Sequence, residues 1–174
     1  MDRQIITISF RFIGLVLLQL FILNNIQFSS ILNPFLYVYF LIALPVDFRP
    51  SLALLLGFLL GLTIDIFCQT LGIHTIAATF AAFCRPYILL YMAPRDGYEF
   101  SRIPSVRQMG WLWFTTYSGL LILMHHLTLF LVEMFRMSGL MNTIGKTFGS
   151  TLLTLILVLI TQLIFIKRSG STYE

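Results

Sequence analysis

An aspartate inside an apolar run is the residue of this sequence best placed to carry chemistry. Asp65 follows Gly61-Leu62-Thr63-Ile64 and precedes Ile66 and Phe67. A carboxylate at membrane depth is costly unless it is paired, protonated or close to water. His74, just beyond the next turn, lies at a similar depth and is the partner that we predict for it. The alternative, with equal weight, is that Asp65 reaches the headgroup layer and anchors the turn.

Two adjacent histidines and a glutamate form the second group of ionisable residues. His125 and His126 diverge around a helix because they are neighbours, and Glu133 follows two turns later. This spacing is not that of a zinc motif, and it favours polar packing between helices. The sequence also contains no Gly-x-Ser-x-Gly, no His-Glu-x-x-His and no paired intramembrane carboxylates. We therefore predict no catalytic residue, no metal, no cofactor and no enzymatic activity.

Small residues point to close contact between helices. Gly57 and Gly61 are four apart, a spacing that lets two helices approach closely in lipid, within this chain or, less favoured, against a partner. Gly72 lies in the turn before the next helix, and Arg85-Pro86 lies near that helix's far end, where Pro86 is expected to bend or stop it. The candidate residues for packing or for a partner interface are Gly57, Gly61, Asp65, Gly72, His74 and Arg85.

The composition indicates which solvent surrounds these residues. Of 174 residues, 58% are hydrophobic and only 10% are charged, and 17 are Phe. A soluble domain of this length cannot hide so much apolar surface. The net charge of +4 is carried in gaps between apolar runs, which favours topology signals and anionic lipid over nucleic acid.

The apolar runs predict an all-α polytopic membrane protein with one transmembrane domain, residues 1–174, and six helices. The first run is too long for a signal-peptide core, and we expect it to be retained. The second is short, so it is either lengthened by its flanks or buried among its neighbours. The predicted helices cover residues 5–23, 34–44, 51–67, 73–92, 109–135 and 147–166.

Basic residues then predict the orientation. Six spans place both termini on one side, and that side receives eight Lys and Arg residues: Arg3, Arg49, Arg85, Arg95, Arg102, Arg107, Lys167 and Arg168. The other side receives Arg136 and Lys146. Because cytoplasmic loops carry the excess of Lys and Arg, we expect both termini to be cytoplasmic.

The central stretch resembles the MreD family of rod shape-determining proteins. The matching residues are Gly57-x-x-x-Gly61-Leu62-Thr63-Ile64-Asp65-Ile66, then Leu71-Gly72 and Ala77-Ala78. Arg85-Pro86-Tyr87 and Pro94-Arg95-Asp96-Gly97-Tyr98-Glu99 look like the Bacteroidetes branch of that family. The resemblance covers about residues 47–99. Cys68 and Gln69 depart from it, since many members have a small residue there.

The resemblance implies a bacterial inner-membrane scaffold of the cell-elongation machinery, which synthesises peptidoglycan and maintains rod shape. It implies association with MreC and, through MreC, with RodA, a penicillin-binding-protein synthase and MreB. It also implies a fold similar to the substrate-binding subunits of energy-coupling-factor transporters. The alternative function is therefore a small-molecule-binding subunit of a membrane transporter, with a pocket near Asp65, His74, His125 and Glu133.

Overall fold

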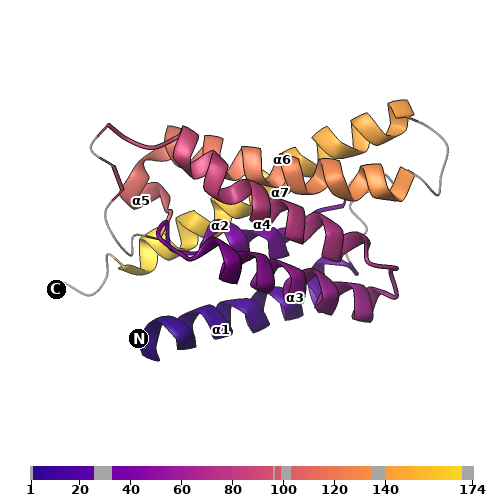
Figure 1. Ribbon diagram of the computed structural model, residues 1–174, viewed down its shortest axis with the longest axis horizontal. Helices are drawn as coiled ribbons and strands as arrows, with labels where there is room; N and C mark the ends of the chain where they lie inside the picture. Colours follow the sequence, from indigo (N-terminus) through magenta and orange to yellow (C-terminus); the bar gives the residue numbers. More distant parts are fainter. Residues whose placement is uncertain (1, 26–32, 96, 99–102, 135–139, 170–174) are drawn as a thin grey trace.

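The computed structural model describes residues 2–25, 33–95, 97–98, 103–134 and 140–169. The regular elements in this part of the chain are all helices (Figure 1). The helices, in chain order, are α1 (Asp2–Leu18), the π turn η1 (Gln19–Leu23), the 3-10 turn η2 (Leu36–Val38), α2 (Tyr39–Ile42), α3 (Pro50–Cys68), α4 (Ile73–Tyr91), α5 (Val106–Met109), α6 (Trp111–Met134) and α7 (Leu140–Ser169).

Five helices among the described residues are long and apolar enough to span a membrane: Gln4–Leu23, Pro50–Cys68, Ile73–Tyr91, Trp111–Glu133 and Thr143–Ile164. They confirm the prediction of a helical chain with several apolar helices of membrane-spanning length. The remaining predicted span, residues 34–44, is the second in chain order and contains only η2 and α2. Seven residues of helix rise about 10 Å, a third of the roughly 30 Å hydrocarbon core. The prediction of six spanning helices is therefore not confirmed.

The short η2–α2 segment is buried among the longer helices, the second of the two outcomes expected for it. Every residue from Tyr37 to Leu44 is buried, and most have no exposed surface. Pro34 precedes the segment and Pro45 follows it, so neither end extends as a helix. Its backbone ends therefore depend on neighbouring side chains for hydrogen bonds.

Pro86 does not stop α4, and one predicted boundary elsewhere was wrong. α4 continues past Pro86 to Tyr91, one residue from its predicted end at residue 92. Proline is tolerated within membrane helices because neighbouring groups satisfy the carbonyl that it leaves free. The last helix begins at Leu140, seven residues before the predicted start, so most of the loop expected at residues 136–146 is helical. Residues 135–139 lie outside the described part of the chain.

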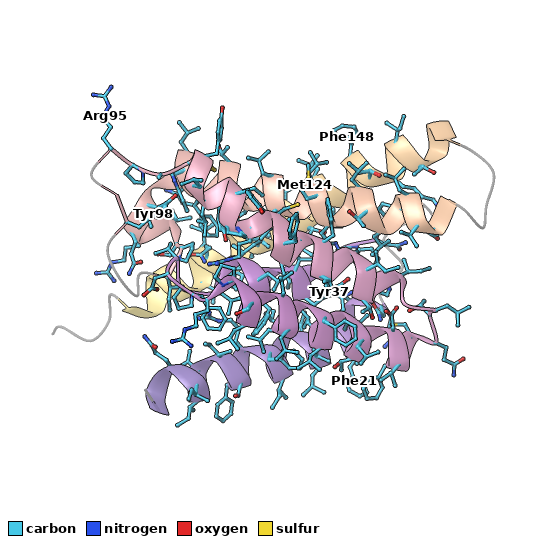
Figure 2. The ribbon with its side chains drawn as sticks, in the orientation of Figure 1. Phe21, Tyr37, Arg95, Tyr98, Met124 and Phe148 are labelled. Carbon is cyan, nitrogen blue, oxygen red and sulfur yellow. The ribbon has the colours of Figure 1, made fainter. Side chains whose placement is uncertain are left out.

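The long helices form one bundle in which α4 packs between α3 and α6, and α6 packs against α7 (Figure 1). The start of α1 and the last turns of α7 lie at the same end of the bundle. Arg95 lies at that end and points outward (Figure 2). We call this end the termini end. The turn between α3 and α4 lies at the opposite end.

Candidate functional site

The α3–α4 hairpin is the most closely packed contact of the bundle, and two glycines make it so. A Cβ added at Gly61 would lie 2.4 Å from the Cα of Thr75 and 2.5 Å from the carbonyl oxygen of His74. One added at Gly57 would lie 2.8 Å from the Cβ of Ala82. Real atoms do not approach so closely, so only glycine fits at both positions. The small-residue stripe thus packs within the chain, against α4.

Asp65 is buried, with 3% of its surface exposed, and it binds the start of α4. Its carboxylate accepts hydrogen bonds from the backbone N–H groups of His74 (3.1 Å) and Thr75 (2.7 Å). It also accepts from the hydroxyls of Thr70 and Thr75. The first N–H groups of a helix have no partner within it, and the helix dipole favours an anion there. Asp65 therefore caps α4 from the end of α3.

Asp65 contacts its predicted partner, His74, through the backbone and not through the side chain. Asp65 binds the backbone N–H of His74, whereas the imidazole Nδ1 of His74 lies 2.9 Å from the hydroxyl of Tyr37. The turn that Asp65 holds uses two left-handed residues, Gln69 with φ 54° and Gly72 with φ 81°. Gly72 is suited to this conformation because it has no Cβ, and it precedes the first residue of α4.

The hydroxyl of Tyr37 joins three elements. It lies 2.9 Å from Nδ1 of His74 on α4 and 2.7 Å from Nε2 of His125 on α6. A phenol has one proton, so one neutral ring must accept from it and the other must donate to it. Nδ1 of His125 is buried without a hydrogen-bond partner among the described residues. Because an unpartnered donor costs more than an unpartnered acceptor, the proton of His125 is best placed on Nε2, facing Tyr37.

A second histidine chain ties α6 to α7. Nδ1 of His126 lies 2.9 Å from the carbonyl of Ile122, and Nε2 lies 3.3 Å from the hydroxyl of Thr154. The same hydroxyl accepts the backbone N–H of Phe35 at 3.1 Å. The ring of Phe35 packs on His126 and on His74, with centroids 5.5 and 5.2 Å apart. The two adjacent histidines therefore serve packing, as expected.

Two arginines bind the carbonyl groups at the end of α2. Nε of Arg85 donates to Leu41 O at 3.0 Å, and Nη2 donates to Leu44 O (2.7 Å) and Pro45 O (2.8 Å). Arg11 on α1 donates to Ala43 O. A cation is favourable beside these carbonyls because the helix dipole is negative at its C-terminal end. Arg85 is 2% exposed, whereas Arg11 is half-buried.

Two aromatic side chains donate hydrogen bonds to carbonyl groups at the end of α4. The hydroxyl of Tyr98 donates to Leu89 O at 2.8 Å, and the indole N–H of Trp113 donates to Met92 O at 2.9 Å. Their rings meet edge to face, with centroids 5.9 Å apart. Burial raises the pKa of the Tyr98 phenol, so it remains a donor at neutral pH.

Three cavities lined by described residues lie toward the termini end. One of about 650 Å³ opens between α1 and α7. One of about 150 Å³ shares Thr7, Arg11 and Ile103 with the first. One of about 330 Å³ lies beside Arg85, Asp47 and Tyr98. None of these three cavities is lined by Asp65, His74, His125 or Glu133. The first three of these residues are hydrogen-bonded inside the bundle.

Five of the six candidate residues meet in the α3–α4 hairpin: Gly57, Gly61, Asp65, Gly72 and His74. Arg85 lies eleven residues beyond His74, about 16 Å further along α4. Tyr37, Arg11 and Thr154 were not predicted, although Arg11 is a charge inside an apolar run. In the described part of the chain no cluster of three His, Cys, Asp or Glu side chains is arranged to hold a metal.

Comparison with protein-family models, with curated proteins and with solved structures found no match for this chain. The resemblance to MreD therefore rests on the residues of the central stretch alone.

Proposed function

We propose that this chain is a non-enzymatic scaffold of the bacterial inner membrane that binds the single transmembrane helix of an MreC-type partner. It would thereby serve the cell-elongation machinery, with RodA, its penicillin-binding-protein synthase and MreB reached through that partner. The observation that supports a scaffold is the use made of the buried charges. Asp65 and Arg85 both bind backbone groups at helix ends, and such bonds fix helices relative to each other.

The contact face that we propose is an aromatic ladder on α4, formed by Phe80, Phe83 and Tyr87. These side chains are 41%, 49% and 61% exposed. Adjacent rings pack on each other, with centroids 6.5 Å apart for Phe80 and Phe83 and 5.3 Å for Phe83 and Tyr87. Rings already held in place lose little freedom when a helix docks on them, and aromatic residues dominate interface energetics.

The orientation belongs to the same proposal. The start of α1, the last turns of α7 and Arg95 lie at one end of the bundle (Figures 1 and 2). Because basic residues concentrate on the cytoplasmic side, we assign the termini end to the cytoplasm. A single-span partner with a periplasmic domain would then meet α4 within the bilayer.

The test is co-purification with MreC in mild detergent, using the double variant Phe83→Ala/Tyr87→Ala. Truncating two exposed aromatic anchors is expected to reduce retained MreC by about tenfold or more. The matched control is Phe148→Ala/Leu152→Ala, which removes two side chains of similar exposure on α7. Full retention of MreC by the ladder variant, with normal rod growth, would overturn the assigned face. A wild-type chain that retains no MreC would overturn the function.

Variants of Gly61 and Asp65 are weaker tests of partner binding. Both residues are inside the hairpin, so their replacement disturbs the fold before it reaches any partner. Asp65→Ala and Gly61→Leu are still expected to weaken co-purification, but through loss of the hairpin. Variants of the exposed aromatic ladder distinguish loss of the partner contact from loss of the hairpin, because the ladder lies on the surface.

The transporter alternative has a definite requirement. It needs a small molecule beside Asp65, His74, His125 and Glu133, and mass spectrometry of the purified protein would reveal one. Small-molecule pockets measure about 300–1,000 Å³, and the larger of the two described cavities in this range lies between α1 and α7. The residues that line this cavity favour a membrane lipid over a transported small molecule, as argued below.

A further inference from the structure

The cavity between α1 and α7 has an apolar wall and a polar floor. The wall includes Phe10, Leu15, Leu18 and Leu36, and the floor includes Arg11, Tyr39 and Gln162. Phe10 is 75% exposed, whereas Leu36 and Gln162 are each 5% exposed. The lining thus runs from the outer surface of α1 into the bundle, and it forms a groove open to the surroundings of α1.

Arg11 is the one charged side chain among the described residues of this lining. It lies seven residues after Gln4, the first residue of the candidate span, which is a rise of about 10 Å. A guanidinium has five N–H donors, and the hydrogen bond to Ala43 O uses one. A cation at this depth is stabilised by an anion, and no carboxylate is among the described residues that line the groove.

Tyr39 and Gln162 complete the floor. Nε2 of Gln162 donates to the hydroxyl of Tyr39 at 2.7 Å, and this bond does not use the proton of that hydroxyl. The floor therefore offers a phenol O–H and a guanidinium to an incoming acceptor. Two adjacent donors, one of them charged, suit a phosphate or carboxylate oxygen.

The dimensions of the groove match one leaflet of a bilayer. Its lining extends along α1 from Thr7 to Leu18, a rise of about 16 Å. Half of a hydrocarbon core is about 15 Å. The smaller cavity, of about 150 Å³, continues past Arg11 to Gln4 and Pro45. An apolar chain thus fits along Leu15 and Leu18, with space for a headgroup beside Arg11.

We propose that this groove binds one anionic membrane lipid, with its acidic headgroup on Arg11 and Tyr39 and one acyl chain along α1. The headgroup lies toward the termini end, so the lipid comes from the leaflet on that side. The bound lipid supplies the counter-charge for Arg11 and fills the space between α1 and α7. This assignment does not depend on the proposed scaffold function.

Gly14 provides a variant that blocks the groove without disturbing the fold. It lines the groove, and a Cβ added there meets no atom within 4 Å. Gly14→Leu therefore places a side chain into the space of the acyl chain. Gly145 on α7 is equally open and does not line the groove, so Gly145→Leu is its matched control.

The experiment is native mass spectrometry of the full chain in detergent, with phosphatidylglycerol and phosphatidylcholine supplied in equal amounts. The expected result is one retained phosphatidylglycerol per chain, with little phosphatidylcholine. Arg11→Gln should reduce this retention by about tenfold or more, because a charge-assisted contact is lost. Gly14→Leu should abolish it, and Gly145→Leu should leave it unchanged.

Three outcomes would overturn the assignment. Equal retention of the two lipids would indicate only the annular lipid of any membrane protein. Unchanged retention by Gly14→Leu would place the lipid outside the groove. Unchanged retention by Arg11→Gln would remove the headgroup contact. Circular dichroism and a melting curve of each variant show that it is folded, so that a loss of lipid is not a loss of structure.

Discussion

The α4 side and the α1 side of this bundle hold their helices in different ways. On the α4 side, backbone touches backbone at Gly61, and Asp65, Tyr37 and Arg85 make hydrogen bonds with little exposed surface. On the α1 side, a cavity of about 650 Å³ separates α1 from α7, and its charged residue is half-buried. The close packing of the α4 side leaves no room for a bound molecule. The cavity on the α1 side, with its polar floor and apolar wall, has room for one.

The largest expected difference is between two glycines. Gly61→Leu should lower the free energy of unfolding by more than about 3 kcal/mol, because its Cβ meets the backbone of α4. Gly14→Leu should change it by less than about 1 kcal/mol, because the added side chain enters open space. Thermal unfolding in detergent measures both. Gly61→Ala tests the same contact with a single added carbon, and equal stability of Gly61→Ala and Gly14→Ala would refute the comparison.

Next come the two arginines that bind the end of α2. Arg85→Gln should cost about 3 kcal/mol, because it leaves buried carbonyl groups without donors. Arg11→Gln should cost about 1 kcal/mol, since it removes one hydrogen bond from a half-buried site. Denaturant titration of each variant in the same detergent checks the order. A larger loss for Arg11 would reverse the assignment of the α4 side as the rigid one.

The carboxylate of the hairpin comes third. Asp65→Ala should cost about 2 kcal/mol, because two helix-terminal N–H groups lose their acceptor. Asp47→Ala, at an exposed carboxylate in the turn before α3, should stay within about 0.5 kcal/mol. Faster hydrogen exchange of the amides of His74 and Thr75 in Asp65→Ala would identify the lost cap. Unchanged exchange at these two amides would argue against it.

Two tyrosines of the same buried segment give the smallest contrast. Tyr37→Phe removes a hydroxyl that lies between two histidines and should cost about 1.5 kcal/mol. Tyr39→Phe removes one contact with Gln162 and should cost about 0.5 kcal/mol. Melting temperatures measured side by side test this, and nitrogen shifts of His74 and His125 should change only in Tyr37→Phe. Equal shifts in both variants would show that the hydroxyl of Tyr37 is not shared.

The long helices could be predicted from the sequence because they are continuous apolar runs, and length alone distinguishes them. The prediction placed two of these helices at residues 51–67 and 73–92, and no end differs by more than one residue from the observed Pro50–Cys68 and Ile73–Tyr91. The close approach at Gly57 and Gly61 was also predictable, since spacing and size suffice. Local rules of this kind need no knowledge of the rest of the molecule.

Most of what was not predicted depends on contacts between distant parts of the chain. The cap that Asp65 forms is the exception, because its two N–H donors lie only nine and ten residues away, where the free N–H groups at the start of a helix attract a carboxylate. Tyr37 could not be recognised, because its two histidines lie 37 and 88 residues away. The groove at Arg11 arises from how far α1 stands from α7, and no residue pattern encodes that distance.

The buried η2–α2 segment has a consequence for the order in which the chain is assembled. The carbonyl groups at its far end are bound by Arg85 on α4, and the residues that lead into it, Asn33 and Phe35, donate their N–H groups to Ser150 and Thr154 on α7. During synthesis these donors and acceptors emerge from the ribosome roughly 40 to 120 residues later. The segment therefore makes its last contacts only when α7 has been inserted beside it, later than α1, α3 and α4.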